Sequence, residues 1–222
     1  MTTDFEEKWK QGQKEDWSQN QTEVERFFYR FDVNITDTYS RLLGVDYDHM
    51  QVVCYLISKI MLAVKLCDYL DLLKRDEHRD VDVIKIYLLI SHAEITMNNL
   101  GFLGVKKDMV KDYFNPVHDE HRLKYMIKLS LTSMEEGGSL DFAGILYKIR
   151  NQYTHKGDYT GRIFKDKSGD AINMFDFSDG SKNIYGECDL TYMEFMNIYL
   201  KALRAHIDSF IKPKSQKIPP NN

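Results

Sequence analysis

The sequence predicts a mainly α-helical bundle with a small β-hairpin inserted before its last helix. Three observations support this prediction. Apolar residues recur at three- and four-residue spacing over most of the chain, which is the period of a helix packed against a core. Glycine or charged links interrupt these runs at 44, 75–80 and 101–104. Short apolar runs separated by turn-forming residues occur only at about 158–187.

The first half of the chain predicts three helices behind a polar arm. Residues 1–20 are polar and are expected to form a loosely held N-terminal arm. Apolar residues from Phe27 to Leu43 then recur at helical spacing, which predicts a first helix ending at Gly44. The longest helix candidate covers about 48–74, and a third helix covers about 81–100.

The middle of the chain predicts shorter helices. Two are expected within 106–134, separated by the proline-containing break at 115–117. A longer one is expected over 140–156, because Ser139 can cap its start and Gly157 can end it.

The last part of the chain predicts the hairpin and a closing helix. The segment 158–187 predicts two or three β-strands. Thr191 and Glu194 then have the spacing of a capping box, which predicts the start of the last helix. The expected organisation is one helical domain over 21–211, followed by a flexible tail at 212–222.

Composition narrows the possible functions. A chain of 222 residues that is 43% hydrophobic is long enough for one sizeable core. The net charge of −4 provides no global positive field for nucleic acid, so an RNA partner would need a local basic patch. The three cysteines show no metal-binding spacing, and no signal peptide or uncharged run of ~18 apolar residues is present, so we expect a cytoplasmic protein. The common phosphate-loop, hydrolase and dinucleotide motifs are absent from the sequence.

The helix expected over 140–156 presents a polar face away from the core. Arg150 lies at the edge of its apolar arc, while Asn151 and His155 are four residues apart and share the outer face. The residues expected on its buried face are Phe142, Ile145, Leu146, Ile149 and Tyr153.

These three polar residue types can support RNA cleavage without a metal. His155 stands in the last helical turn and can act as general acid and base. Arg150 can hold phosphate oxygens with its guanidinium group, and Asn151 can orient the histidine or the phosphate. Because Arg150 and His155 are about 140° apart around an ideal helix, two copies of the helix meeting across a two-fold axis would form a more compact site. RNA contacts are expected from Lys148, Lys156, Tyr159 and Arg162.

Structural roles for the same residues remain open. His155 can be a C-capping histidine, and Arg150 can pair with a carboxylate such as Glu94 inside the bundle. His92 and His206 lie on apolar stripes and are expected to be hydrogen-bonded core histidines. The histidines of "HDEH" at 118–121 have metal-ligand spacing, but a solvated helix face is the favoured interpretation.

The motif "RNQYTH" at 150–155 resembles the R-x4-6-H motif of the HEPN superfamily. The order of helices, the position of the motif and the hairpin before the closing helix are also similar to that family over about residues 48–211. The resemblance implies a homodimeric, metal-independent endoribonuclease that needs no cofactor and acts in toxin–antitoxin systems or antiviral defence. It implies Arg150, Asn151 and His155 as the catalytic residues. It also implies a possible antitoxin or regulatory protein as partner. The alternative is a non-catalytic HEPN-like module that binds a protein partner or a nucleotide.

Overall fold

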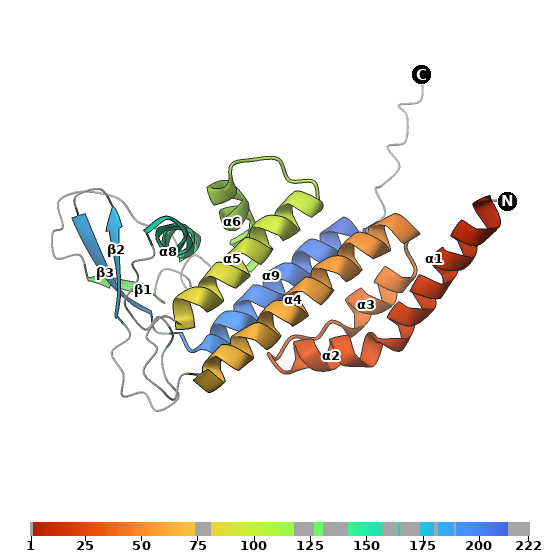
Figure 1. The fold of residues 1–222 in the computed structure, drawn as a ribbon, viewed down its shortest axis with the longest axis horizontal. Coiled ribbons are helices and arrows are strands. Elements are labelled where there is room, and N and C mark those ends of the chain that lie inside the picture. Colours follow the sequence, from red (N-terminus) through yellow and green to blue (C-terminus); the bar gives the residue numbers. More distant parts are fainter. Residues whose placement is uncertain are drawn as a thin grey trace, which may run out of the picture.

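The computed structural model describes residues 2–73, 81–117, 127–130, 142–156, 164, 174–179, 182–188 and 190–212. Its centre consists of three long helices, α4 (Tyr47–Leu73), α5 (Val81–Asn99) and α9 (Tyr192–Phe210). Figure 1 shows α4 and α5 side by side, with α9 between and behind them. The mainly helical class predicted from the sequence is therefore confirmed.

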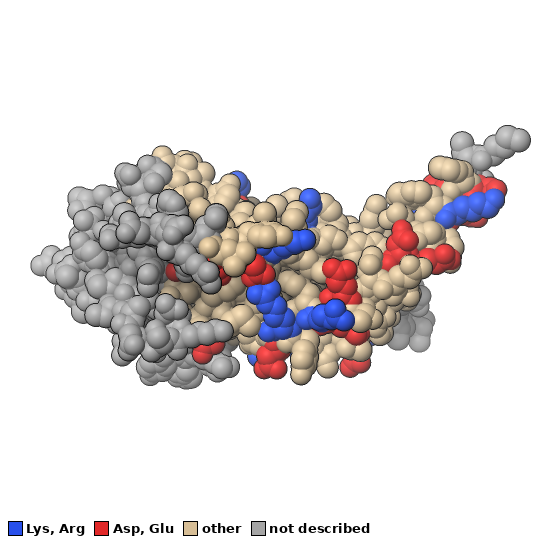
Figure 2. Space-filling model, turned by 60° about the horizontal axis from the view of Figure 1, so that its bottom comes forward, with Lys and Arg blue, Asp and Glu red and all other residues tan. Residues whose placement is uncertain are grey.

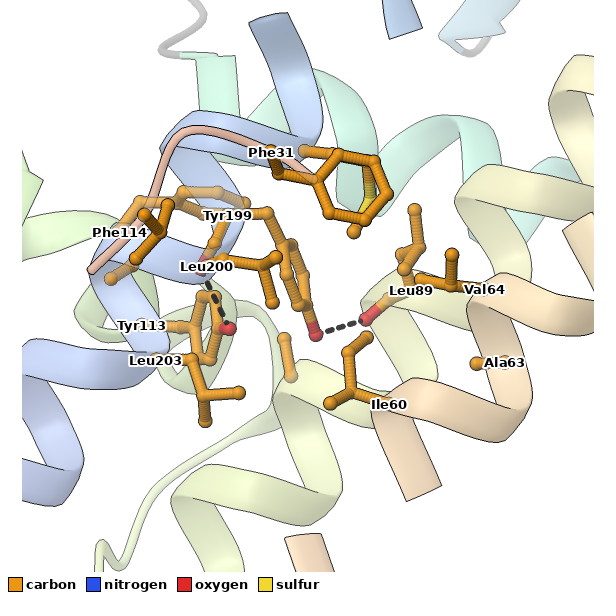
Figure 3. Packing of buried hydrophobic residues seen from close by; sticks show 14 of the residues in the cluster. Phe31, Ile60, Ala63, Val64, Leu89, Tyr113, Phe114, Tyr199, Leu200 and Leu203 are labelled. Carbon is orange, nitrogen blue, oxygen red and sulfur yellow. Dashed lines mark hydrogen bonds between the residues drawn. The ribbon is translucent and has the colours of Figure 1, made fainter. Parts of the chain in front are cut away.

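The core is held by tyrosines as well as by aliphatic side chains. Tyr199 of α9 is fully buried, and its hydroxyl donates a hydrogen bond of 2.8 Å to the carbonyl of Leu89 on α5. The Tyr113 hydroxyl donates in turn to the carbonyl of Tyr199 at 3.1 Å, as Figure 3 shows. The phenols of Tyr199 and Tyr113 thus both have a partner, which removes the main cost of placing these polar groups in the core.

The N-terminal region differs from its prediction. The polar arm expected at 1–20 is an 18-residue helix, α1 (Thr2–Gln19), which packs on the helices that follow it. The Tyr39 hydroxyl, for example, donates to the carbonyl of Trp17 at 2.9 Å. A polar sequence hides this packing, because only a few aromatic residues of α1 contact the bundle.

The first helix expected to end at Gly44 is instead two helices, α2 (Gln21–Tyr29) and α3 (Thr36–Leu43). The chain turns between them at Asp32, whose φ of 56° lies in the left-handed region. The turn brings Phe31 and Val33 into the core, and the side-chain amide of Asn197 donates to the carbonyl of Phe31 at 2.7 Å. Helical spacing continues across this break, so the sequence pattern does not reveal it.

The middle of the chain contains α6 (Lys106–Phe114) and a short 3-10 turn, η2 (Asn115–Val117). The second helix expected within 106–134 is wrong where the structure describes this region, because β1 (Ile127–Ser130) is a strand. It pairs antiparallel with β3 (Lys182–Cys188), which also pairs antiparallel with β2 (Met174–Asp179), giving the order β1-β3-β2. The strands β2 and β3 lie within or next to the expected hairpin segment, whereas β1 is contributed from earlier in the chain.

The helix α8 (Phe142–Lys156) packs on α5 and α6 and lies beside β2. Figure 1 shows it nearly end-on between α5 and the sheet. After the sheet, α9 begins at the predicted capping box: Thr191 accepts a hydrogen bond from the Glu194 amide, and Glu194 accepts one from the Thr191 amide.

A buried lysine joins the ends of α4, α5 and α9. Lys85 is 1% exposed, and its Nζ lies 2.5 Å from Oδ1 of Asp71 and 4.2 Å from the centre of the Tyr192 ring. Because a buried ammonium group requires a counter-charge, this contact fixes how α5 sits on α4.

Candidate functional site

The apolar face of α8 is buried in the core, as the sequence predicts. Ile145, Leu146 and Ile149 are each at most 2% exposed, and Tyr153 is partly buried against the same core. On the opposite side, Asn151 is half-buried and His155 is exposed. The core anchors the helix, so its polar face has a defined direction.

Arg150 is held by a carboxylate from α5. Its Nη2 lies 2.8 Å from Oε2 of Glu94, and the two side chains are only 12% and 9% exposed. The pairing with Glu94, one of the two possibilities open from the sequence, is therefore confirmed. Burial raises the pKa of Glu94, and the positive charges of Arg150 and Lys106 lower it in part.

Asn151 contacts the arginine that precedes it. The Nη1 atom of Arg150 donates a hydrogen bond of 2.7 Å to Oδ1 of Asn151. Glu94 and Asn151 therefore occupy the two terminal nitrogens of the guanidinium, and each restrains its rotation. From the sequence, Asn151 was expected to orient the histidine or the phosphate; the structure shows it on the arginine.

Two tyrosines that the sequence analysis did not name flank this guanidinium. The ring centres of Tyr87 and Tyr147 each lie 6.0 Å from the Arg150 Cζ atom, at the outer limit of a cation–π contact. Tyr87 also lies 6.0 Å from the Tyr153 ring. Tyr87 and Glu94 are seven residues apart, so they lie on one face of α5. This spacing could have indicated from the sequence that the two residues act together, but it does not show that their face of α5 contacts α8.

Two polar atoms at the ion pair have no hydrogen-bond partner among the residues that the structure describes. They are Nε of Arg150 and Oε1 of Glu94, both buried. Buried polar groups are normally paired, so these two atoms mark a place where a water molecule or a ligand oxygen would be favourable. The Nε–H is a donor without a partner among the described residues, and it is closed to solvent.

His155 is solvent-exposed near the end of α8. Five residues separate it from Arg150, which corresponds to about 7.5 Å of rise on an ideal helix. One copy of the helix therefore presents a free imidazole and a restrained guanidinium on different parts of its surface. Chemically, the exposed ring can exchange protons with a solvent-borne substrate.

The other histidines of the described core are structural, as predicted. His92 is 4% exposed; its Nε2 donates to the carbonyl of Leu56 at 3.0 Å, and its Nδ1 lies 2.7 Å from the Tyr199 hydroxyl. Burial lowers the pKa of His92 to about 4. His206 is buried as well, with Nε2 2.9 Å from the carbonyl of Tyr113.

Several expected site residues fall outside the described part of the chain. Lys148 is half-buried on α8, whereas the side chain of Lys156 and all of Tyr159 and Arg162 lie outside it, as do the histidines of 118–121. Within the described ranges, no cluster of three or more His, Cys, Asp or Glu side chains is arranged to hold a metal ion. The thiols of Cys54 and Cys67 are buried, as expected for small core residues.

Comparison of the chain with protein-family models, with curated proteins and with solved structures finds no match.

Proposed function

We propose that this protein is a metal-independent endoribonuclease of HEPN type that works as a homodimer in the cytoplasm. One observation supports the proposal most: Arg150 is held by Glu94 and Asn151 on the same helix that exposes His155. A restrained cation and an exposed imidazole are the two groups that phosphodiester cleavage without a metal requires.

In the proposed reaction, a neutral His155 removes the proton from a ribose 2′-hydroxyl group. The 2′-oxygen then forms a bond to the adjacent phosphorus, and the bond from phosphorus to the 5′-oxygen breaks. The leaving oxygen takes a proton from a second, protonated imidazole. The products are a 2′,3′-cyclic phosphate and a 5′-hydroxyl end, so atoms and charge balance without any added reagent.

Arg150 supplies the positive charge in this scheme. Negative charge builds up on the phosphate oxygens in the transition state, and a preorganised guanidinium stabilises it without reorganisation. Glu94 and Asn151 fix its orientation. Since one copy offers one exposed imidazole on α8, the second proton carrier is proposed to be the His155 of a symmetry-related copy.

The setting that we propose is a toxin–antitoxin system or antiviral defence, in which an antitoxin or another regulatory protein restrains the nuclease. Regulation of this kind would protect cellular RNA, because a nuclease that needs no metal is active whenever its dimer is assembled.

A second candidate is a non-catalytic HEPN-like module that binds a protein partner or a nucleotide. The side chain of Arg150 is only 12% exposed and is neutralised by Glu94, which also fits a purely structural ion pair. On the face shown in Figure 2, blue basic and red acidic side chains alternate over the described surface, without a broad basic patch. Binding through a protein surface would need no such patch.

Cleavage of single-stranded RNA in EDTA separates the two candidates. The wild-type protein should be compared with His155→Ala and with His49→Ala, a matched control because the His49 side chain is 44% exposed and lies at the start of α4. We expect the wild type and the control to cleave, and His155→Ala to be slower by about 10²–10⁴-fold. Equal cleavage by His155→Ala, or cleavage only with added metal, would exclude the mechanism.

A further inference from the structure

The helix α4 exposes a stripe of large apolar side chains to solvent. Its inner face lines the core, yet its outer face carries large apolar side chains over almost five turns, with exposed Ser58, Lys59 and Lys65 among them. The exposed residues are Tyr55 (45%), Leu62 (52%), Leu66 (45%), Tyr69 (56%) and Leu72 (67%). Single exposed apolar residues are normal, but a continuous stripe of them indicates a surface that contacts something.

The helix α5 widens this stripe into a face. Ile95 is 43% exposed, and Ile84 and Leu88 are half-buried on the same side of the helix. The hydrogen bond from His92 to the carbonyl of Leu56 sets the register of α5 against α4. Figure 1 shows the two helices side by side over their length, and we infer from the positions of these residues on each helix that the two outward stripes are neighbours. We call these residues, with the five of α4, the α4–α5 face.

The area of the α4–α5 face fits a protein interface. Six large side chains that are each about half exposed leave on the order of 600 Å² of apolar surface in water, at the upper end for a monomer. A stable dimer buries about 800 Å² per partner, so this face supplies most of the area required. The lysines near its centre, Lys59 and Lys65, are exposed, and Lys59 lies 5.2 Å from the ring centre of Tyr55.

The two tyrosines of the α4 stripe lie symmetrically about one residue. Tyr55 lies seven residues before Leu62, and Tyr69 lies seven residues after it. Two antiparallel α4 helices that cross at Leu62 would therefore place Tyr55 of each copy opposite Tyr69 of the other. A two-fold axis requires this kind of self-complementarity, since each residue pair must occur twice.

We propose that a second copy of this chain packs on the α4–α5 face, about a two-fold axis that passes Leu62 and runs across the helices in the plane of the interface. This inference rests on the proposed function, which needs two copies to complete its site. Such an axis pairs α4 with α4 and α5 with α5, and it leaves both α8 helices at the same edge of the dimer. α5 then connects the dimer interface with the candidate catalytic site, because Ile95 faces the partner and the preceding residue, Glu94, holds Arg150.

A bilayer is the main competing occupant of this face. Judged by length and apolar composition alone, α4 from Tyr47 to Leu72 is the helix in the described part of the chain that could cross a membrane. Within an apolar window of 18 residues in that stretch, 44% is buried inside the protein. The two lysines at the centre of the face and the symmetric arrangement of the tyrosines favour a protein partner, since neither serves contact with lipid chains.

Light scattering after size exclusion, over a range of protein concentrations, tests the proposal. We expect the wild type to be dimeric, Leu62→Glu to be monomeric, and Leu103→Glu to remain dimeric. Leu103 is a matched control because it is 97% exposed in the loop after α5, outside the face. Circular dichroism shows whether each variant is folded. A monomeric wild type, or a Leu62→Glu variant that is still dimeric, would overturn the proposal.

Engineered charge pairs test how the two α4 helices are aligned across the interface. This test does not require a variant that abolishes the dimer. The double variant Tyr55→Lys/Tyr69→Glu places opposite charges together only across the interface, and we expect it to dimerise at least tenfold more tightly than Tyr55→Glu/Tyr69→Glu. Equal dissociation constants for the two would overturn the register. Co-flotation of the wild type with phosphatidylcholine vesicles, lost in Leu62→Glu, would identify a bilayer as the occupant and also overturn the proposal.

Failure of the interface can be told apart from failure of the proposed function. A wild-type dimer that separates in Leu62→Glu but cleaves no RNA would support the interface and reject the nuclease. Cleavage at the wild-type rate by a monomeric Leu62→Glu would support the nuclease and overturn the idea that this face completes its site.

Discussion

Breaking the ion pair between Arg150 and Glu94 should strongly destabilise the protein. Replacing Glu94 with Gln removes the counter-charge and leaves a guanidinium that is only 12% exposed. Removing one partner of a buried pair costs about 3–5 kcal/mol, because the remaining charge has lost its solvation and its partner. For a chain of this size, that corresponds to a decrease in Tm of roughly 10 °C.

A double-mutant cycle distinguishes this effect from a general loss of packing. Glu94→Gln, Arg150→Met and the double variant should be compared by urea unfolding, followed by circular dichroism. We expect the double variant to lose less stability than the sum of the single variants, with a coupling energy of about 1.5–3 kcal/mol. Asp4→Asn, in the exposed pair with Lys8, serves as a control and should leave the midpoint unchanged. A coupling below about 0.5 kcal/mol would refute the interpretation of this pair as buried and interdependent.

Four further outcomes follow from single residues. Because the pKa of His92 is lowered to about 4 in the folded state, the contribution of His92 to the free energy of unfolding should be complete above about pH 6.5 and fall by roughly 3 kcal/mol as the pH decreases to 4; a His92→Gln variant with the same pH profile as the wild type in urea titrations would contradict this. Thr191→Ala should cost about 1 kcal/mol in the same assay, since it removes the N-cap hydrogen bond of α9, whereas Thr191→Ser should retain most of it. Burial raises the pKa of the Cys54 and Cys67 thiols to about 12 and about 11, so iodoacetamide at pH 8 should label neither in the native protein and both in urea, as read by peptide mass spectrometry. Asn151→Ala should lower the rate constant for RNA cleavage about tenfold with little change in KM, because the amide positions Arg150; an unchanged rate constant would assign it no such role.

Much of the helical framework could be predicted, because its signals are local. The helices at 47–73, 81–99, 142–156 and 192–210 each combine apolar spacing with a stop or capping signal in the sequence. The direction of the polar face on α8 followed from the same spacing. Burial of His92 and His206 also followed, since each lies on an apolar stripe.

The differences arise where tertiary contacts decide the outcome. Helical spacing from Phe27 to Leu43 does not show that the chain turns at Asp32, because the turn is stabilised by Asn197 from a helix over 160 residues away. The strand β1 forms by pairing with β3, a partner that its own sequence does not reveal. α1 contacts the bundle through few residues, so its polar composition indicated an arm.

The candidate site was predictable in its parts and not in its arrangement. Arg150, Asn151 and His155 lie within six residues of the sequence, and Glu94 was one of many carboxylates that could pair with Arg150. That Glu94 holds the arginine, and that Tyr87 lies beside it, depends on how α5 meets α8. Helix–helix packing of this kind is set by the whole core.

The most direct test of the nuclease mechanism is cleavage of a short single-stranded RNA in EDTA, compared with the same RNA carrying one 2′-deoxy nucleotide immediately before the cleaved bond. We expect the all-ribose RNA to give a 2′,3′-cyclic phosphate and a 5′-hydroxyl end, and the substituted RNA to remain intact at that position. Cleavage at the deoxy position, or a 5′-phosphate end, would show that no 2′-oxygen attacks and would contradict the roles given to His155 and Arg150.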